Sequence, residues 1–252
     1  MIGMFDSGVG GLSVLAELRR LHPRLDVLYL ADSAHALYSQ RPLIEVAELS
    51  HRNVEWLLAQ GAEAIAIACN TASAAALNDL RRVHPAVSFV GMEPAVKPAR
   101  AYTRSGVIGV LATEATFQGE LFASVVGRFA DGVEIVARSC SGWADLVEAG
   151  KVAGPEVEAA IAKHLDPVLE AGADTLVLGC THYPFLLPVL HYLAGAQVVI
   201  VDPAPAVARQ IGRLATGRGS GRIRIRTTGD AAQVQTTMHR LTGWDEQVSA
   251  IT

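Results

Sequence analysis

The composition describes a compact chain and excludes a disordered or general nucleic-acid-binding one. Hydrophobic residues make up 50% of the 252 residues and charged residues only 18%, which is too apolar for a disordered chain. The sequence has 21 lysines and arginines and 25 aspartates and glutamates, which gives a net charge of −4. Because this charge provides no positive electrostatic field, we expect no nucleic-acid partner.

The N-terminal residues and the spacing of the cysteines indicate where in the cell the protein is located. Met1 runs directly into Ile2–Phe5 and Asp6, without the basic and long apolar segments of a secretory signal. The longest apolar runs, such as Ala64–Cys69, are far shorter than the roughly 18 residues that predict a membrane helix. The three cysteines are widely spaced and form no Cys-x-x-Cys, which argues against a disulfide framework. We therefore expect a cytoplasmic protein with no membrane contact.

Short apolar runs alternate with helical periodicity in the first 94 residues. Strand-length runs begin at Ile2, Val27, Ala64 and Val87. Between them, apolar residues recur at helical spacing, for example at Leu12, Leu15, Ala16 and Leu18. This alternation predicts parallel strands joined by helices that cover both faces of a sheet.

The middle of the chain repeats this order. The block GAEAIAIACNT from Gly61 matches GADTLVLGCTH from Gly172, and VSFVGMEPAV from Val87 matches VVIVDPAPAV from Val198, both at an offset of 111 residues. At an offset of 106 residues, the runs from Ile2 and Val27 match those from Ile108 and Val133. Four matches in the same order indicate an internal repeat and therefore two similar lobes.

The residues after Ala206 have no counterpart in the first repeat. They predict a helix with Val207, Ile211 and Leu214 on one face, a glycine-rich turn at 217–221 and a strand at 223–227. We expect this segment to complete the first lobe. The predicted fold is α/β, with two pseudo-symmetric lobes of parallel sheet flanked by helices and an active site in the cleft between them. Lobe one would comprise 1–94 and 206–252, and lobe two 95–205.

Reactive side chains follow the predicted strands at their carboxyl ends, where ligands bind in such sheets. Cys69 and Cys180 occupy equivalent places in the two repeats, so in facing lobes they would reach one cleft from opposite sides. Inversion by deprotonation and reprotonation needs one acid–base group on each face of a carbon. A helix that begins after each cysteine would lower the thiol pKa. For a single cysteine, a buried structural role would be the ordinary interpretation.

Asp6 and His182 are candidate helpers of the two thiols. Asp6 ends the first predicted strand, and His182 lies two residues after Cys180. The alternatives are a helix cap for Asp6 and a backbone-bonded residue of a first helical turn for His182. Zinc held by Cys69, Cys180 and His182 would lack a fourth ligand, so we predict no metal. The glycines of Gly8–Gly11 lack nucleotide-loop spacing and predict a small-anion contact or a tight turn.

Six motifs spread over nearly the whole chain carry a family resemblance. They are FDSGVGG from Phe5, ACNTAS from Ala68, GMEPAVKPA from Gly91, ATEAT from Ala112, LVEAG from Leu146 and GCTHYPFL from Gly179. Together they resemble the glutamate racemases of the aspartate/glutamate racemase superfamily. The resemblance implies two α/β lobes, no cofactor such as pyridoxal phosphate, no metal, and two thiols that act as acid and base. It also implies production of D-glutamate for bacterial peptidoglycan.

The resemblance assigns roles by position in these motifs. Cys69 would take the α-proton from the D-enantiomer with the help of Asp6. Cys180 would take it from the L-enantiomer with the help of Glu148 and His182; without the resemblance, Glu148 would be interpreted as a solvated helix residue. Substrate contacts are implied for Asp6, Ser7, Tyr38, Ser39, Asn70, Thr71, Thr116, Thr181 and His182.

Two positions depart from the family pattern. Leu37-Tyr38-Ser39 stands where the family has Pro-Tyr-Gly, and Cys140-Ser141-Gly142 stands where it has Cys-Pro-Gly. Since the family glycine is expected to offer its N–H to the side-chain carboxylate of the substrate, Ser39 bears on specificity.

Two alternatives to glutamate racemisation follow. The first is a racemase of the same superfamily that acts on aspartate or another α-substituted acid. The second is a binding role without turnover, which the presence of both cysteines disfavours. We predict a small-molecule substrate, glutamate, and a homodimer, with no nucleic-acid or membrane partner.

Overall fold

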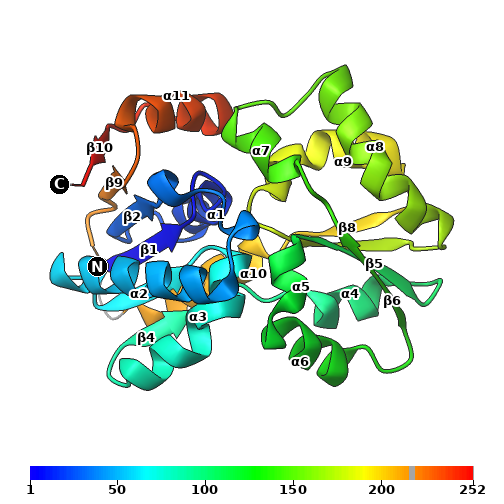
Figure 1. Ribbon diagram of the computed structural model, residues 1–252, viewed down its shortest axis with the longest axis horizontal. Coiled ribbons are helices and arrows are strands. Elements are labelled where there is room, and N and C mark those ends of the chain that lie inside the picture. Colours follow the sequence, from blue (N-terminus) through cyan, green and yellow to red (C-terminus); the bar gives the residue numbers. More distant parts are fainter. Residues whose placement is uncertain (216–218, 252) are drawn as a thin grey trace.

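The computed structural model describes residues 1–215 and 219–251, whose strands form two separate parallel sheets (Figure 1). The larger sheet has the order β10-β9-β2-β1-β3-β4, and the smaller has the order β6-β5-β7-β8. We call the larger sheet with its helices the first lobe and the smaller sheet with its helices the second lobe. The strands are β1 (Ile2–Asp6), β2 (Val27–Ala31), β3 (Ala64–Ile67), β4 (Ser88–Val90), β5 (Val107–Ala112), β6 (Glu134–Ser139), β7 (Thr175–Gly179), β8 (Val199–Val201), β9 (Ile223–Thr227) and β10 (Val248–Ala250).

Helices connect and cover the strands in both lobes. In the first lobe they are α1 (Leu12–Leu21), α2 (Leu43–Ala59), α3 (Asn70–Val83), α10 (Ala204–Leu214) and α11 (Ala231–Thr242), with the short 3-10 helices η1 (Ser33–His35) and η2 (Tyr38–Gln40). In the second lobe they are α4 (Val96–Tyr102), α5 (Glu114–Gln118), α6 (Glu120–Phe129), α7 (Trp143–Glu148), α8 (Pro155–Glu170), α9 (Leu187–Ala194) and the 3-10 helix η3 (Tyr183–Leu186). Within the described ranges, no helix is both long and apolar enough to cross a membrane.

The predicted fold class and internal repeat are confirmed by the strand order. The order β2-β1-β3-β4 in the first lobe is equivalent to β6-β5-β7-β8 in the second, and every pairing is parallel. Consequently β3 and β7 occupy the same place in their sheets, and each is followed by a cysteine, Cys69 or Cys180.

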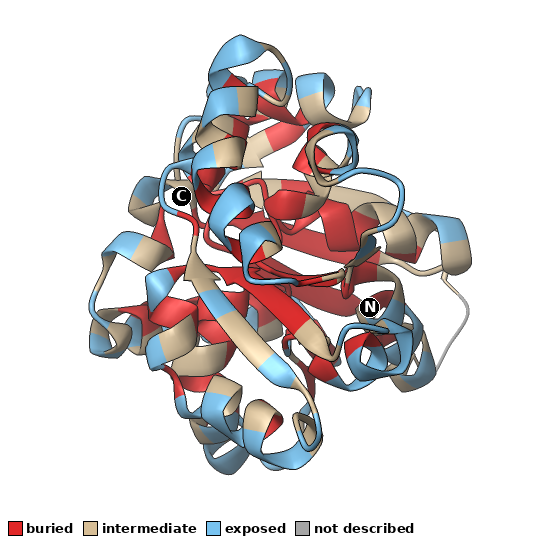
Figure 2. Cartoon of the chain, turned by 90° about the vertical axis from the view of Figure 1, so that its right-hand side faces the viewer, coloured by how far each residue is buried: buried red, intermediate tan, exposed pale blue. Residues whose placement is uncertain are grey.

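The central strands β1, β2 and β3 of the first lobe are buried on both faces, as their nearly continuous apolar sequences predict. Along β1, Ile2 and Met4 pack into one apolar cluster, whereas Phe5 packs into another on the opposite face. Figure 2 shows the consequence, with buried strands in the interior and exposed surface on the outer turns of the helices.

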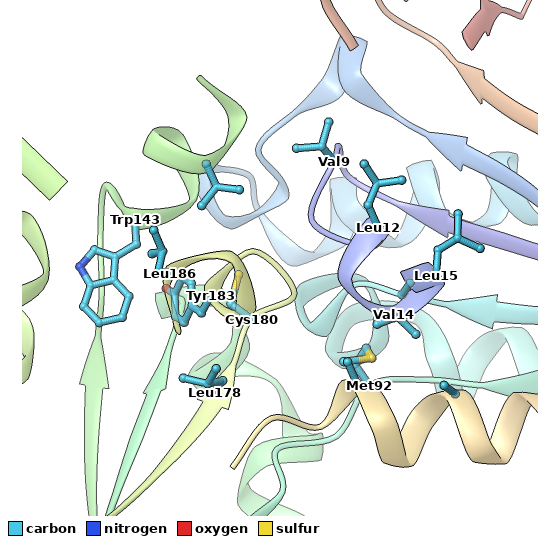
Figure 3. Packing of buried hydrophobic residues seen from close by; sticks show 14 of the residues in the cluster. Val9, Leu12, Val14, Leu15, Met92, Trp143, Leu178, Cys180, Tyr183 and Leu186 are labelled. Carbon is cyan, nitrogen blue, oxygen red and sulfur yellow. The ribbon is translucent and has the colours of Figure 1, made fainter. Parts of the chain in front are cut away.

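The two lobes share part of their core. Val9 and Leu12 of the first lobe belong to the same apolar cluster as Trp143 and Tyr183 of the second. The rings of Trp143 and Tyr183 meet edge to face at a centroid distance of 4.9 Å. Figure 3 shows these two groups of side chains on either side of the junction between the lobes.

The C-terminal segment returns to the first sheet. Strand β9 pairs in parallel with β2, and β10, which the sequence did not predict, adds to the edge beside β9. Of the predicted glycine-rich turn at 217–221, residues 217 and 218 lie outside the described residues. The lobe boundaries at 94/95 and 205/206 stay a prediction.

Candidate active site

The two thiols lie at equivalent strand ends and are almost fully buried. Cys69 directly precedes α3, and its Sγ accepts a hydrogen bond from the Ala72 N–H at 3.4 Å. Cys180 follows β7 and is 6% exposed, against 5% for Cys69. A negative charge on Cys180 would act to raise the pKa of Cys69.

The expectation that a helix N-terminus lowers the pKa of Cys69 is wrong. Burial raises this pKa well above its ordinary value, and the neighbouring Asp6 carboxylate raises it further. The N–H of Ala72 acts in the opposite direction but does not outweigh them. After Cys180 the chain forms the short helix η3 before α9, so no long helix begins directly at this thiol.

Asp6 is held at the end of β1 by backbone donors. Its Oδ1 accepts the Ser7 N–H at 2.7 Å, and its Oδ2 accepts the Gly11 N–H at 2.5 Å. Burial raises the pKa of this fully buried carboxyl group above its usual range, although interactions with His182, Gly11 and Cys69 act to lower it. The predicted cap role and the predicted helper role are therefore compatible, because the same carboxylate binds the start of α1 and lies beside Cys69.

Cys180, His182 and Glu148 form a chain of contacts in the second lobe. His182 Nδ1 lies 3.6 Å from Cys180 Sγ, and His182 Nε2 lies 2.7 Å from Glu148 Oε1. Burial of the ring acts to lower the pKa of His182, but its interactions with Cys180 and Glu148 outweigh this and raise the pKa well above its ordinary value. His182 therefore bonds to side chains rather than to backbone, and Glu148, with a side chain 22% exposed, is not a fully solvated helix residue.

Several predicted substrate contacts gather where the lobes meet. Thr71 Oγ1 of the first lobe lies 3.1 Å from Thr113 Oγ1 of the second, which in turn lies 2.9 Å from Thr116 Oγ1. Both side-chain amide atoms of Asn70 are buried without a hydrogen-bond partner among the described residues. Because an unpaired buried amide is unfavourable, this group is suited to receive a polar ligand. Ser7 and Thr181 are also buried, at 3% and 2% exposure.

The segment that carries Ser39 is anchored by a buried carboxylate that sequence reasoning did not select. Asp32, 1% exposed, accepts hydrogen bonds from the Tyr38 hydroxyl and from Thr228 Oγ1 at 2.7 Å. The Tyr38 hydroxyl also accepts from Asn53 Nδ2 at 2.9 Å. The hydroxyl of Tyr38 is thus occupied by protein groups, while Ser39 is half-buried. The position of Asp32 at the end of β2, equivalent to that of Asp6 at the end of β1, was the available signal.

A cavity of about 350 Å³ opens between the lobes beside Glu148. The first lobe contributes Val9, Leu37 and Gln40 to its lining, and the second contributes Asp145 and Glu148. Gln40 Nε2 donates to Asp145 Oδ1 at 3.0 Å across the cavity. Glu148, which lines this cavity, contacts His182, and His182 in turn contacts Cys180.

The remaining cysteine has a different environment. Cys140 is 2% exposed, its thiol donates to the Arg138 carbonyl at 3.4 Å, and burial raises its pKa. Its own carbonyl accepts the Tyr183 hydroxyl. Among residues 1–215 and 219–251, no group of three or more histidine, cysteine or acidic side chains is arranged to hold a metal ion.

Comparisons with known sequences agree with the motif resemblance. A family model described as Asp/Glu/Hydantoin racemase matches residues 13–211. The chain is 48% identical over 248 residues to a glutamate racemase of Roseiflexus sp. (strain RS-1), covering 95% of this chain and 91% of that protein. It is 45% identical over 253 residues to a glutamate racemase of Ectopseudomonas mendocina (strain ymp), covering 98% and 96%.

Solved structures extend the similarity to the whole fold. A Thermus thermophilus glutamate racemase in complex with β-chloro-D-alanine is 35% identical, with a TM-score of 0.86 and coverage of 100% of this chain and 96% of that chain. The Escherichia coli glutamate racemase in complex with L-glutamate and the activator UDP-MurNAc-ala is 28% identical, with a TM-score of 0.88 and coverage of 100% and 98%. Aspartate racemase from Picrophilus torridus, 14% identical with a TM-score of 0.57 and coverage of 84% and 92%, shares the fold alone.

Proposed function

Since this chain belongs to the Asp/Glu/Hydantoin racemase family, we propose that it interconverts L-glutamate and D-glutamate by means of two thiols, those of Cys69 and Cys180. The substrate is a small molecule. Glutamate is favoured over aspartate because the relatives at 48% and 45% identity are glutamate racemases, whereas the aspartate racemase of Picrophilus torridus is only 14% identical.

The observation that carries this proposal is the equivalence of the two thiols. Cys69 follows β3 and Cys180 follows β7, strands that occupy the same place in two repeated sheets. Each thiol has a separate acidic helper, Asp6 for Cys69 and Glu148 acting through His182 for Cys180. Two acid–base groups that approach one carbon from opposite faces are what stereochemical inversion requires.

In the L-to-D direction, Cys180 acts as a thiolate. It takes the α-proton of L-glutamate and becomes a thiol, while the electron pair of the broken C–H bond stays on the α-carbon. The Cys69 thiol then gives its proton to the opposite face and becomes a thiolate. One proton is taken up and one is released, so no oxidant is consumed, and the enzyme is left ready to accept D-glutamate.

The ionisation of the site is consistent with this direction. Because burial and Asp6 raise the pKa of Cys69, this thiol keeps its proton and can serve as the acid. Because hydrogen bonds to Cys180 and Glu148 raise the pKa of His182 despite burial, the protonated ring is favoured and can stabilise a thiolate at Cys180. Glu148 in turn accepts a hydrogen bond from this ring.

The polar groups around the thiols are suited to hold the substrate. The unpaired amide of Asn70 and the hydroxyls of Thr71, Thr181 and Ser7 can bind its amino and α-carboxylate groups. The backbone N–H near Ser39 and the hydroxyl of Thr116 can bind its side-chain carboxylate; because the Tyr38 hydroxyl is already bonded to Asp32, we expect Tyr38 to contribute through its backbone. Hydrogen bonds to a charged acceptor contribute about 1.5 to 3 kcal/mol each.

Circular dichroism of pure protein with each enantiomer of glutamate and aspartate tests the proposal. We expect the signal of either glutamate enantiomer to decay to zero without added cofactor. Cys69→Ala and Cys180→Ala should each abolish racemisation, whereas the control Cys140→Ala should retain it. Racemisation of aspartate but not glutamate would establish the alternative substrate, which the substitution of serine at position 39 suggests. Full activity of either site variant would contradict the two-thiol mechanism.

We also propose that the D-glutamate produced serves peptidoglycan synthesis. A deletion strain should then grow only with supplied D-glutamate and should recover when the gene is restored. A cytoplasmic location and a homodimer stay predictions, which fractionation and sedimentation would test.

A further inference from the structure

Two glycines of the first lobe lie directly against the acid–base pair of the second. A Cβ atom added at Gly8 would lie 2.0 Å from Glu148 Oε1, and one added at Gly10 would lie 2.4 Å from His182 Nδ1. Both separations are far below any real contact between such atoms. Gly8 and Gly10 therefore provide the space that the Glu148–His182 pair occupies.

The backbone does not require glycine at these two positions. Neither Gly8 nor Gly10 is among the glycines with positive φ, so their conformations are open to other residues. The tight-turn interpretation of the Gly8–Gly11 motif does not explain them. Their lack of a side chain is explained by the approach of Glu148 and His182 from the opposite lobe.

The same loop also supplies a donor to this pair. The Val9 N–H donates to Glu148 Oε1 at 2.9 Å, the oxygen that also contacts His182. The loop is fixed in turn by the Tyr29 hydroxyl, which donates to the Gly8 carbonyl at 2.8 Å. Ser13 Oγ lies 2.9 Å from the Gly10 carbonyl and 2.8 Å from the Thr181 carbonyl, and so joins the loop to the strand end that carries Cys180.

The two thiols differ in where their helpers are held. Asp6, beside Cys69, receives its backbone hydrogen bonds from Ser7 and Gly11, both of its own lobe. Glu148, which serves Cys180, receives its backbone hydrogen bond from Val9 of the other lobe. Separation of the lobes would leave the first arrangement intact and would break the second.

We infer that the Gly8–Gly10 segment of the first lobe is a positioning element for Glu148 and His182, so that the acid–base pair at Cys180 is complete only when the lobes are closed. This inference rests on the proposed racemase function. Gly8, Val9 and Gly10 do not take part in proton transfer. They act by fixing the carboxylate and imidazole that assist Cys180, and they leave the Cys69 side unaffected.

Gly8→Ala tests this inference, because the added methyl group must displace the Glu148 carboxylate. Since a misplacement of about 1 Å at such a site can cost on the order of 100-fold in rate, we expect kcat/KM for glutamate to fall about 10- to 100-fold. In the Glu148→Ala background the obstructing carboxylate is absent. In that background Gly8→Ala should lower kcat/KM by less than about twofold, because the effects of substitutions that act through the same contact are not additive.

Isotope effects identify which thiol is affected. Because the equilibrium constant of a racemisation is one, kcat/KM falls equally for L-glutamate and D-glutamate. The values of kcat/KM therefore cannot show which thiol is affected, but the identity of the rate-limiting proton transfer can. Suppose that proton transfer at Cys180 is slowed. Because Cys180 removes the α-hydrogen of L-glutamate, the kinetic isotope effect measured with α-deuterated L-glutamate should rise or stay at its maximum. Because Cys69 removes the α-hydrogen of D-glutamate, the isotope effect measured with α-deuterated D-glutamate should fall towards one. A change that merely destabilises the fold would alter neither.

Gly3→Ala is the matched control within the first lobe. Its Cβ would lie 2.8 Å from the Cβ of Ala62, so it overpacks the first lobe without touching Glu148. We expect it to lower thermal stability with unchanged isotope effects. The inference is overturned if Gly8→Ala retains full kcat/KM, if its cost multiplies with that of Glu148→Ala, or if the isotope effect rises with D-glutamate instead. A wild-type protein that does not racemise glutamate would instead refute the proposed function.

Discussion

Tyr38→Phe tests whether the hydrogen bonds at Asp32 fix the segment that carries Ser39. Tyr38 is 1% exposed, and its hydroxyl donates to Asp32 Oδ2 while it accepts from Asn53 Nδ2 at 2.9 Å. Phenylalanine keeps the ring in place and removes a single oxygen. The change therefore deletes one donor to a buried carboxylate without opening a large cavity.

The size of the expected stability loss depends on the hydrogen bonds that Asp32 keeps in the Tyr38→Phe variant. A hydrogen bond to a charged group contributes about 1.5 to 3 kcal/mol to stability. Asp32 keeps His35 Nδ1 at 2.7 Å and Thr228 Oγ1 at 2.7 Å, so its carboxylate stays partly satisfied. We expect the free energy of unfolding to fall by about 2 kcal/mol, which for a chain of this length lowers Tm by about 4 to 8 °C.

Thermal unfolding and steady-state kinetics would measure both consequences. Because we propose that this segment holds the side-chain carboxylate of the substrate, we expect KM for glutamate to rise several-fold with a smaller change in kcat. Tyr192→Phe is the matched control, since Tyr192 is 75% exposed. A Tm for Tyr38→Phe within about 1 °C of that control would refute the role of Asp32 in stability. A lowered Tm with unchanged KM would refute the link to substrate binding.

Three further predictions concern stability, specificity and proton exchange. Although burial acts to raise the pKa of Asp174, hydrogen bonds from Thr103, Arg104 and Ser105 hold it well below its ordinary value of about 3.8. The ionised Asp174 carboxylate therefore contributes to the free energy of unfolding above that pH, and this contribution is lost as the pH falls below it. Asp174→Asn should lower the free energy of unfolding at pH 7 by about 1 to 2 kcal/mol. Urea titrations at a series of pH values should show that the difference between the two proteins shrinks as the pH falls through the acid range. Ser39→Gly should lower kcat/KM for glutamate about tenfold if the hydroxyl binds the side-chain carboxylate, and an unchanged value for both glutamate and aspartate would exclude contact with substrate. In D₂O, mass spectrometry should find the product of either enantiomer labelled at the α-carbon, whereas complete retention of the original hydrogen would indicate a single shuttling base.

Much of the architecture follows from local sequence patterns. Apolar runs of strand length and helical periodicity between them located nine of the ten strands, and β9 was predicted at its observed bounds. The repeat alone predicts that Cys69 and Cys180 lie at equivalent strand ends. These features could be predicted because periodicity and internal repeats are properties of neighbouring or directly comparable residues. The short strand β10, only three residues long, carries too little pattern to be found in this way.

The tertiary structure decided what surrounds each reactive group. A cysteine before a helix predicts a lowered thiol pKa, yet burial raises the pKa of Cys69, because desolvation depends on every segment packed around the sulfur. The sequence predicted a small-anion contact or a tight turn at Gly8–Gly11, but Gly8 and Gly10 make room for Glu148 and His182, which follow more than 130 residues later. Contacts of this kind depend on how the two lobes are packed against each other. No local pattern records that packing, so only the folded chain reveals it.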